Sequence, residues 1–229
     1  MRIRLKFTKC GNTKFVGHLD TIRFFQRTIR AAGIPIAYSE GFNPHAKVYF
    51  AMPLSVGMSS KGEYMELITK EDVDVTEVKE LLNKELPEGI KILEAFVIEG
   101  KKDSLMSLVK RASYKIEIRK ETLSTPIIPL IEQKMLDSEL LVEKKTKKGM
   151  KQVDIKPLLM NVELNEENEK VEMVVEVAAG SSQNLSPELF LKAVLGEESL
   201  QSAEYAIERL ELYAVQGNEK IAIDELSKK

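Results

Sequence analysis

The chain has 229 residues, and its 34 Lys and Arg residues nearly balance its 36 Asp and Glu residues, so that the formal net charge is −2. A hydrophobic fraction of 43% and a charged fraction of 31% exclude an intrinsically disordered chain and are typical of a globular protein. No apolar run approaches the roughly 20 residues of a membrane span, so we expect a cytoplasmic protein. The single cysteine, Cys10, is too few for an iron–sulfur cluster or a cysteine-rich zinc site, so we expect no cofactor.

The first part of the chain alternates between strand-like and helix-like patterns. Apolar and basic residues alternate over residues 2–8, which predicts a strand with one apolar face. Apolar residues at helical spacing, beginning at Leu19, predict a helix over residues 19–32 that ends before Gly33. The same reasoning predicts strands over 35–39, 47–51, 63–69 and 90–98 and a second helix over 75–86.

A similar order of elements recurs in the second part of the chain. The order in the first part resembles a ferredoxin-like unit with one added strand. We therefore expect an α+β fold with two tandem ferredoxin-like α/β-sandwich domains and mainly antiparallel sheets. The domains would span residues 1–100 and 101–229, with a join near 100–111 and a peripheral tail from Gly217. The predicted elements of the second domain are strands over 112–119, 158–165, 170–178 and 204–214, a hairpin over 139–155, and helices over 127–136 and 186–195.

The charge is unevenly distributed along the chain. Residues 1–50 hold nine basic and two acidic residues, a formal charge of +7, and eight of the fourteen aromatic residues. The other 179 residues hold 25 basic and 34 acidic residues, a formal charge of −9. A basic, aromatic first domain beside an acidic second domain indicates an anionic partner for the first domain.

Two polar clusters interrupt the apolar pattern, GHLD at residues 17–20 and YSEGFNPHAK at residues 38–47, and they contain the two histidines, His18 and His45. In a strand–helix–strand layout, these clusters can lie near each other. The two imidazoles, with Asp20, would then act as general acid and base in phosphodiester cleavage. Two histidines with a carboxylate would instead bind a divalent metal, although this ligand pattern is weak. The simplest interpretation gives Asp20 a role at the helix start and the histidines ordinary loop roles.

A further interpretation is that the clusters bind phosphates and stack bases. The predicted helix carries three arginines but only one acid, Asp20, whereas an ordinary surface helix mixes charges of both signs. Exposed aromatic side chains next to such a surface can stack on bases. A solvated charged face is the alternative. The candidate nucleic-acid-binding residues are Arg23, Arg27, Arg30, Lys47, Tyr38 and Phe42, and the motif loop contains Glu40, Gly41, Asn43 and Pro44.

The segment that carries both clusters contains a series of motifs: HLD at 18–20, an R-x-x-x-R helix, AGIP at 32–35, YSEGFNPH at 38–45, and PLSVG followed by GEY at 53–64. With these motifs the segment resembles the radical-SAM-linked protein family (DUF2344), a bacterial family of unknown function. The chain differs from the family pattern at Gly17, where the family usually has serine, and at Ala46, where it tends to have proline. The resemblance implies a radical-SAM enzyme, encoded nearby, as the partner that supplies the iron–sulfur cysteines. The family has no established catalytic residues that could be assigned to this chain.

These observations lead to one preferred hypothesis and two alternatives. The preferred hypothesis is an RNA-binding or substrate-presenting accessory protein that works with a separate radical-SAM enzyme and has no contact with a membrane. The first alternative is a phosphodiesterase or ribonuclease, with or without a metal, that uses His18 and His45. The second is a protein–protein adaptor that binds no nucleic acid.

Overall fold

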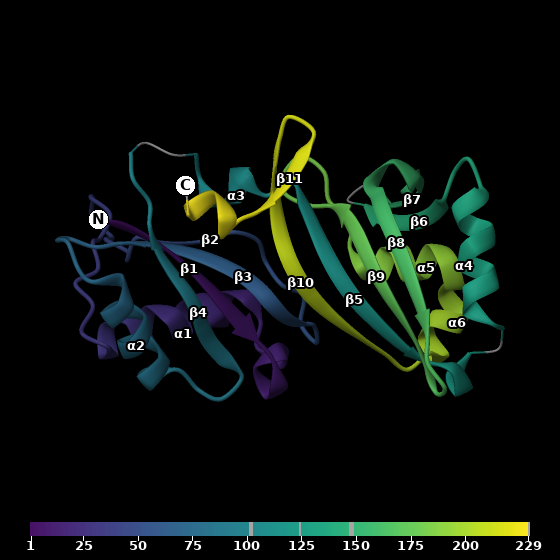
Figure 1. Cartoon of the computed structure of the whole chain (residues 1–229), viewed down its shortest axis with the longest axis horizontal. Helices are drawn as coiled ribbons and strands as arrows, with labels where there is room; N and C mark the ends of the chain where they lie inside the picture. The colour runs from purple at the N-terminus through teal and green to yellow at the C-terminus, as the bar shows by residue number, and fades with distance from the viewer. Residues whose placement is uncertain (101–102, 124, 147–148, 229) are drawn as a thin grey trace. The chain divides into compact units, whose positions relative to one another are not determined.

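The computed structural model describes the chain except for residues 101–102, 124, 147–148 and 229. It is a mixed α+β structure, and the described part contains six α-helices and a mainly antiparallel sheet arrangement (Figure 1). The chain forms two compact units, one made of Met1–Lys110 with Arg209–Lys229 and the other of Arg111–Glu208. The division differs from the predicted consecutive domains, because the end of the chain returns to the first unit.

The first unit is a sheet with two long helices on one face. Its strand order is β4-β1-β3-β10, with β2 also paired to β3 and β11 to β10. β1 is antiparallel to both neighbours, so that Leu5 lies opposite Met65 in β3 and Ala95 in β4. The elements are β1 (Arg2–Lys9), η1 (Gly11–Phe15), α1 (His18–Ala31), β2 (Val48–Phe50), β3 (Ser59–Ile68), α2 (Val75–Glu85), β4 (Ile90–Val97), α3 (Leu105–Leu108), β11 (Glu219–Ala222) and η4 (Glu225–Ser227), and β10 (Tyr205–Gln216) begins in the second unit and ends in the first.

The core of the first unit lies between β1 and two helices, α1 and α2, which lie side by side (Figure 1). Alternate side chains of β1, such as Leu5 and Phe7, are buried in one cluster with Phe25 of α1 and Leu82 of α2. The rings of Phe7 and Phe25 meet edge to face with centroids 4.9 Å apart. This alternation confirms the strand predicted over residues 2–8, with its apolar residues directed to the core.

The buried face of α1 differs from the prediction. Leu19, placed in the apolar line, is 68% exposed. Thr21 is buried in its stead, and its hydroxyl donates a hydrogen bond to the carbonyl of Gly17, which removes the cost of burying it. The buried face therefore begins two residues later than predicted, and its residues are Thr21, Phe25, Thr28 and Ile29.

The opposite face of β1 carries a buried ion network. The guanidinium groups of Arg2 and Arg4 each donate to Glu66 of β3 at 2.7 Å. Arg4 is only 2% exposed, and the Glu66 side chain is fully buried. A charge removed from water is stable only when it is paired and hydrogen-bonded, so this face needs an acid at that position of β3.

The end of the chain completes this network. Lys6 lies 2.5 Å from Glu211 of β10 and 3.0 Å from Asp224. Burial alone would lower the pKa of Lys6, but the hydrogen bonds and charges of these two acids outweigh it and raise that pKa. Arg4 also donates to the carbonyl of Ile223, whose side chain is fully buried. The tail predicted to be peripheral from Gly217 is thus an integral part of the first unit.

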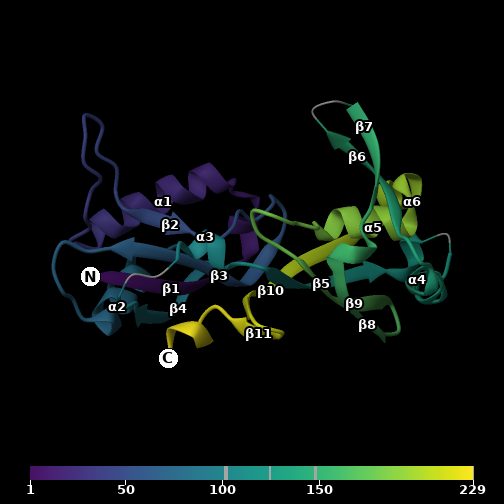
Figure 2. The same ribbon diagram turned by 90° about the horizontal axis from the view of Figure 1, so that it is seen from above.

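The second unit has a sheet of its own. β5, β9 and β8 follow one another in antiparallel pairs, and β6 and β7 form a separate hairpin that projects away from them (Figure 2). Along β5 the alternate side chains Ile116 and Ile118 are fully buried. The elements are β5 (Arg111–Arg119), η2 (Lys120–Thr122), α4 (Ile127–Leu136), β6 (Leu141–Thr146), β7 (Gly149–Asp154), η3 (Lys156–Leu158), β8 (Leu159–Glu166), β9 (Lys170–Ala178), α5 (Pro187–Leu195) and α6 (Glu197–Ser202).

Most predicted elements are confirmed to within a few residues. The predicted strand over 35–39 is reduced to two isolated bridges, Ile36 with Thr69 and Tyr38 with Ala46. The predicted join includes residues 101–102 and the predicted hairpin includes 147–148, which lie outside the described residues. The ferredoxin-like assignment stays a prediction. The sequence patterns did not predict α3, α6 or β11.

Within the described part of the chain, no helix has the length and apolarity that a membrane crossing requires.

The buried network predicts a large stability effect at Glu66. Replacing Glu66 with Gln keeps the side-chain size but removes the buried carboxylate that Arg2 and Arg4 share. We expect the free energy of unfolding, measured by urea denaturation followed by circular dichroism, to fall by about 3–5 kcal/mol. The control is Glu121→Gln, which breaks an exposed pair with Arg119 at 3.6 Å and should change stability by no more than about 1 kcal/mol. Equal effects of the two variants would contradict this account of the network.

Candidate functional site

His18 lies in a half-buried site at the start of α1. Its ring meets the edge of Phe50 with centroids 5.7 Å apart. It borders a cavity of 10 Å³, room for about one water molecule, whose lining also includes Lys9, Thr21 and Glu63. Burial lowers the pKa of His18, the charge of Glu63 opposes this, and the charge of Lys9 adds to it. His18 is therefore a neutral imidazole at neutral pH, able to accept a proton.

The charges beside His18 are held by contacts within the first unit. Arg209 of β10 donates to Glu63 of β3 at 2.7 Å and to the carbonyl of Pro53 at 2.8 Å. Lys9, only 3% exposed, donates to the carbonyl of Val16 at 2.6 Å. Burial lowers the pKa of Lys9, the nearby charge of Glu63 raises it, and that of Arg209 lowers it again. We call Lys9, His18, Glu63 and Arg209 the His18 cluster.

The sequence analysis did not identify Lys9, Glu63 or Arg209 as site residues. Glu63 belongs to the GEY motif. The motif's glycine, Gly62, is required by the packing of the strands, because a Cβ at this position would lie 2.6 Å from the carbonyl oxygen of Leu210. Glycine at that position therefore lets β10 approach β3 closely enough for Arg209 to reach Glu63. The GEY motif was the one available signal, because Arg209 and Glu63 are 146 residues apart.

His45 lies in a different place, in the loop that follows α1. Ser39 and His45 close this loop: the His45 carbonyl accepts from the Ser39 amide at 2.9 Å, and Ser39 Oγ lies 2.9 Å from His45 Nδ1. Tyr38 and Ala46 pair just before and after them. We call residues 38–46 the motif loop. Its exposed tip contains Glu40, Gly41, Phe42, Asn43 and Pro44.

The two histidines do not share a site. His18 is the first residue of α1, and the motif loop follows the last turn of this helix of 14 residues, which is about 20 Å long. Figure 2 shows the motif loop projecting beyond the end of α1 that is opposite to its start. The expected proximity of His18, Asp20 and His45 is therefore wrong, because the helix itself separates the two polar clusters. Within the described residues, no three His, Cys, Asp or Glu side chains are close enough together to hold a metal ion.

The candidate arginines form an exposed face on α1. Arg23 pairs with Asp20 at 3.2 Å, and both side chains are mostly exposed. Arg27 and Arg30 are exposed, and neither has an ion-pair partner among the described residues. Both lie in the last two turns of α1, at the end from which the chain continues to the motif loop. Their guanidinium groups are thus available to an external anion.

The motif loop presents aromatic side chains at the same end of α1. Phe42 is fully exposed, at the tip of the loop, and the neighbouring Gly41 has a φ of 111°, which favours glycine. Tyr38 is 37% exposed, and the amine of Lys70 lies 5.9 Å from its ring centroid. Lys47 follows the loop and is half-buried. Phe42 thus places an apolar ring at the loop tip, where it is free to stack on a base.

Comparison with known proteins agrees with the motif resemblance. A sequence profile described as "Uncharacterized protein conserved in bacteria (DUF2344)" matches residues 2–187. The chain belongs to this family. Among proteins with curated descriptions, no similar sequence was found.

Two solved structures were matched to this chain, and the first resembles its fold. A chain of the "Crystal Structure of a Cbf5-Nop10-Gar1 Complex" is 11% identical with a TM-score of 0.51, and the match covers 92% of this chain but 48% of that chain. This family member thus spans about half of that chain, and the similarity concerns the fold. The "Crystal Structure of an Unknown Protein from Galdieria sulphuraria" is 10% identical over 91% of this chain and 97% of that chain, with a TM-score of 0.27, too low to compare folds.

The environment of His18 predicts a titration below pH 6.5. We expect the histidine Cε1–H NMR signal of His18 to give a pKa below the usual 6.5, because burial disfavours the imidazolium. Lys9→Met removes a positive charge and should raise this pKa towards 6.5. An unchanged His18 pKa in Lys9→Met would contradict the cluster geometry.

The same shift predicts a pH dependence of stability. The unfolded chain binds the His18 proton at a higher pH than the folded chain, so the free energy of unfolding decreases as the pH falls from 6.5 through the lower folded pKa. His18→Gln should remove this part of the decrease. The unfolding free energies of the wild type and the variant are measured at several pH values from 8 to 5. A difference between them that does not change with pH would contradict the prediction.

Proposed function

We propose that the chain is a cytoplasmic RNA-binding accessory protein that works with a separate radical-SAM enzyme. The observation that carries this proposal is the position of Arg27 and Arg30, which are exposed and have no acid partners among the described residues, at the end of α1 from which the chain continues to the motif loop with its fully exposed Phe42. Single-stranded nucleic acid is bound by this combination, because cationic groups contact phosphates and aromatic rings stack on bases.

The distribution of the other basic residues supports a localised interface. Arg2, Arg4 and Lys6 are paired with acids of the same unit, and Lys9 is buried in the His18 cluster. The formal charge of +7 in the first fifty residues therefore overstates the positive surface. The basic side chains that remain exposed are concentrated on α1. The proposed anion-binding surface is therefore smaller than the formal charge of the segment suggests.

The radical-SAM enzyme is proposed as the partner because of the motif resemblance and the single cysteine of this chain. In this proposal the partner supplies the cluster chemistry, and the exposed arginines and the motif loop hold the RNA. The separation of His18 from His45 gives no support to a two-histidine phosphodiesterase. A protein adaptor without RNA affinity is the alternative, and the RNA-binding experiment below distinguishes it.

The first test compares two double variants that remove the same charge. Arg27→Gln with Arg30→Gln removes the proposed phosphate contacts, and Lys84→Gln with Lys91→Gln removes two exposed lysines elsewhere in the first unit. Binding of a labelled single-stranded RNA oligomer is measured by fluorescence anisotropy at several salt concentrations. We expect the arginine variant to bind at least tenfold more weakly and to reduce the slope of log K against log salt by about 1.4, since each phosphate contact contributes about 0.7.

The lysine variant should bind nearly as the wild type does. Equal weakening by the two double variants would mean that only the net charge matters, and it would contradict a located interface. No binding by the wild type at low salt would favour the adaptor alternative.

The second test concerns base stacking by the motif loop. Phe42→Ala should weaken RNA binding by about 1–3 kcal/mol, the usual contribution of a stacked base, without changing the salt slope. The matched control is Phe15→Ala, because Phe15 is 62% exposed and precedes the start of α1, at the end away from the motif loop. Equal affinities of Phe42→Ala and the wild type would exclude stacking on Phe42.

A further inference from the structure

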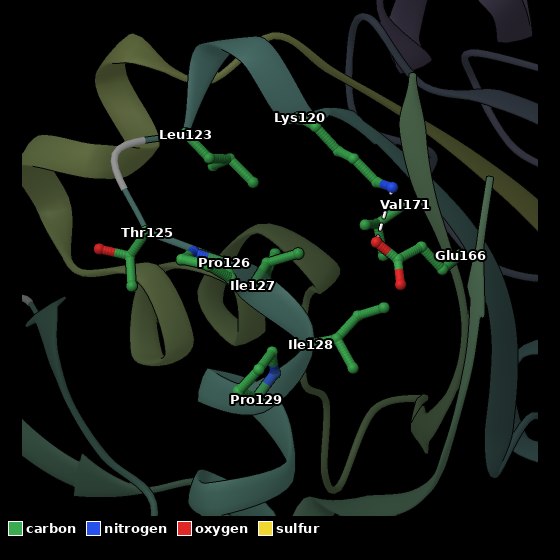
Figure 3. A pocket seen from close by; sticks show the side chains of 9 residues that line it. All are labelled: Lys120, Leu123, Thr125, Pro126, Ile127, Ile128, Pro129, Glu166 and Val171. Carbon is green, nitrogen blue, oxygen red and sulfur yellow. Dashed lines mark hydrogen bonds and ion pairs between the residues drawn. The ribbon is translucent and has the colours of Figure 1, made fainter. Parts of the chain in front are cut away.

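The second unit contains a cavity of 490 Å³ that lies between the start of α4 and the strands β8 and β9 (Figure 3). This volume is within the range of small-molecule sites, roughly 300–1,000 Å³. The cavity lies entirely in residues 120–171, and it shares no residue with the α1 face or the motif loop. It therefore calls for an explanation separate from RNA binding.

The walls of this cavity are apolar. Ile127 and Val171 are buried at its base, whereas Leu123 and Ile128 are partly exposed. Pro126 and Pro129 also line it, and a proline has no backbone N–H to offer to water. In Figure 3 the side chains of Leu123, Ile127 and Ile128 converge on one space, so an apolar group placed there would replace poorly bound water.

One edge of the cavity is charged. Lys120 and Glu166 lie there as an ion pair at 2.6 Å (Figure 3). The Lys120 side chain is 32% exposed and that of Glu166 is 62% exposed. An exposed ion pair contributes little free energy, about 0–1 kcal/mol, so a ligand anion can replace Glu166 at Lys120 at low cost. The reverse exchange, a ligand cation at Glu166, is less favourable, because it would displace the ammonium group of Lys120, the less exposed member of the pair.

We propose that this cavity binds an amphipathic carboxylate, a small molecule with an apolar body and one anionic end. The apolar body lies against Leu123, Ile127 and Ile128. The carboxylate takes the place of Glu166 as the acceptor of the Lys120 ammonium group. This binding site is independent of the proposed RNA interface, which lies on residues of the first unit.

Isothermal titration calorimetry with decanoate tests the site. We expect saturable binding of decanoate at one site and at least tenfold weaker binding of decyltrimethylammonium, which has the same apolar chain and the opposite charge. Lys120→Gln and Ile128→Asp should each weaken decanoate binding at least tenfold. Lys134→Gln, which removes another paired lysine of the second unit, should leave decanoate binding unchanged.

Glu166→Gln gives a result that a folding defect cannot produce. Removal of the competing carboxylate should tighten decanoate binding severalfold, because Lys120 then has no internal acid at that edge. Three results would overturn the proposal: no saturable binding of decanoate, equal binding of the two amphiphiles, or no change in Lys120→Gln. Weaker binding in Glu166→Gln would also overturn it, since it would place the ligand on the carboxylate.

Discussion

The ion network on the far face of β1 determines how the first unit is assembled. Three basic side chains alternate with the apolar side chains of this strand, and one of them, Arg4, is removed from water almost completely. Charges in such a position need partners, and the partners come from β3, from β10 and from the tail at Asp224. These acids therefore hold the end of the chain against the first unit once the chain has passed through the second unit.

The network also determines which positive charges are available to a partner. Arg2, Arg4 and Lys6 contribute to the formal charge of the N-terminal segment but not to an anion-binding surface. In contrast, the helix that covers the other face of β1 has no need to neutralise its outward arginines, and among the described residues only Arg23 of these three has a close acid. The basic residues of β1 thus form ion pairs inside the protein, whereas those of α1 are exposed to a partner.

Local structure was largely predictable from the sequence, because periodicity reflects which face of each element is buried. The predictions for β1, α2, β5, α4 and β9 depended only on such local patterns and were confirmed. Three features were not predictable in this way. The tail lacks a long periodic pattern, the burial of Arg4 depends on Glu66, and the His18 cluster depends on Arg209, which is 146 residues from Glu63. Contacts at such separations leave no trace in local residue spacing. The wrong proximity of His18 and His45 has a different cause, because the helix that separates them is a local element that the sequence did predict.

The most direct test of this division of charges observes the arginine side chains themselves. In the protein with 15N-labelled arginine, the Nε–Hε NMR signals are recorded during titration with a single-stranded RNA oligomer. The account predicts that the signals of Arg27 and Arg30 shift progressively and saturate, whereas those of Arg4 and Arg209 stay in place because their guanidinium groups are held by Glu66 and Glu63. Stationary signals of Arg27 and Arg30, or saturating shifts of Arg4 and Arg209, would contradict it.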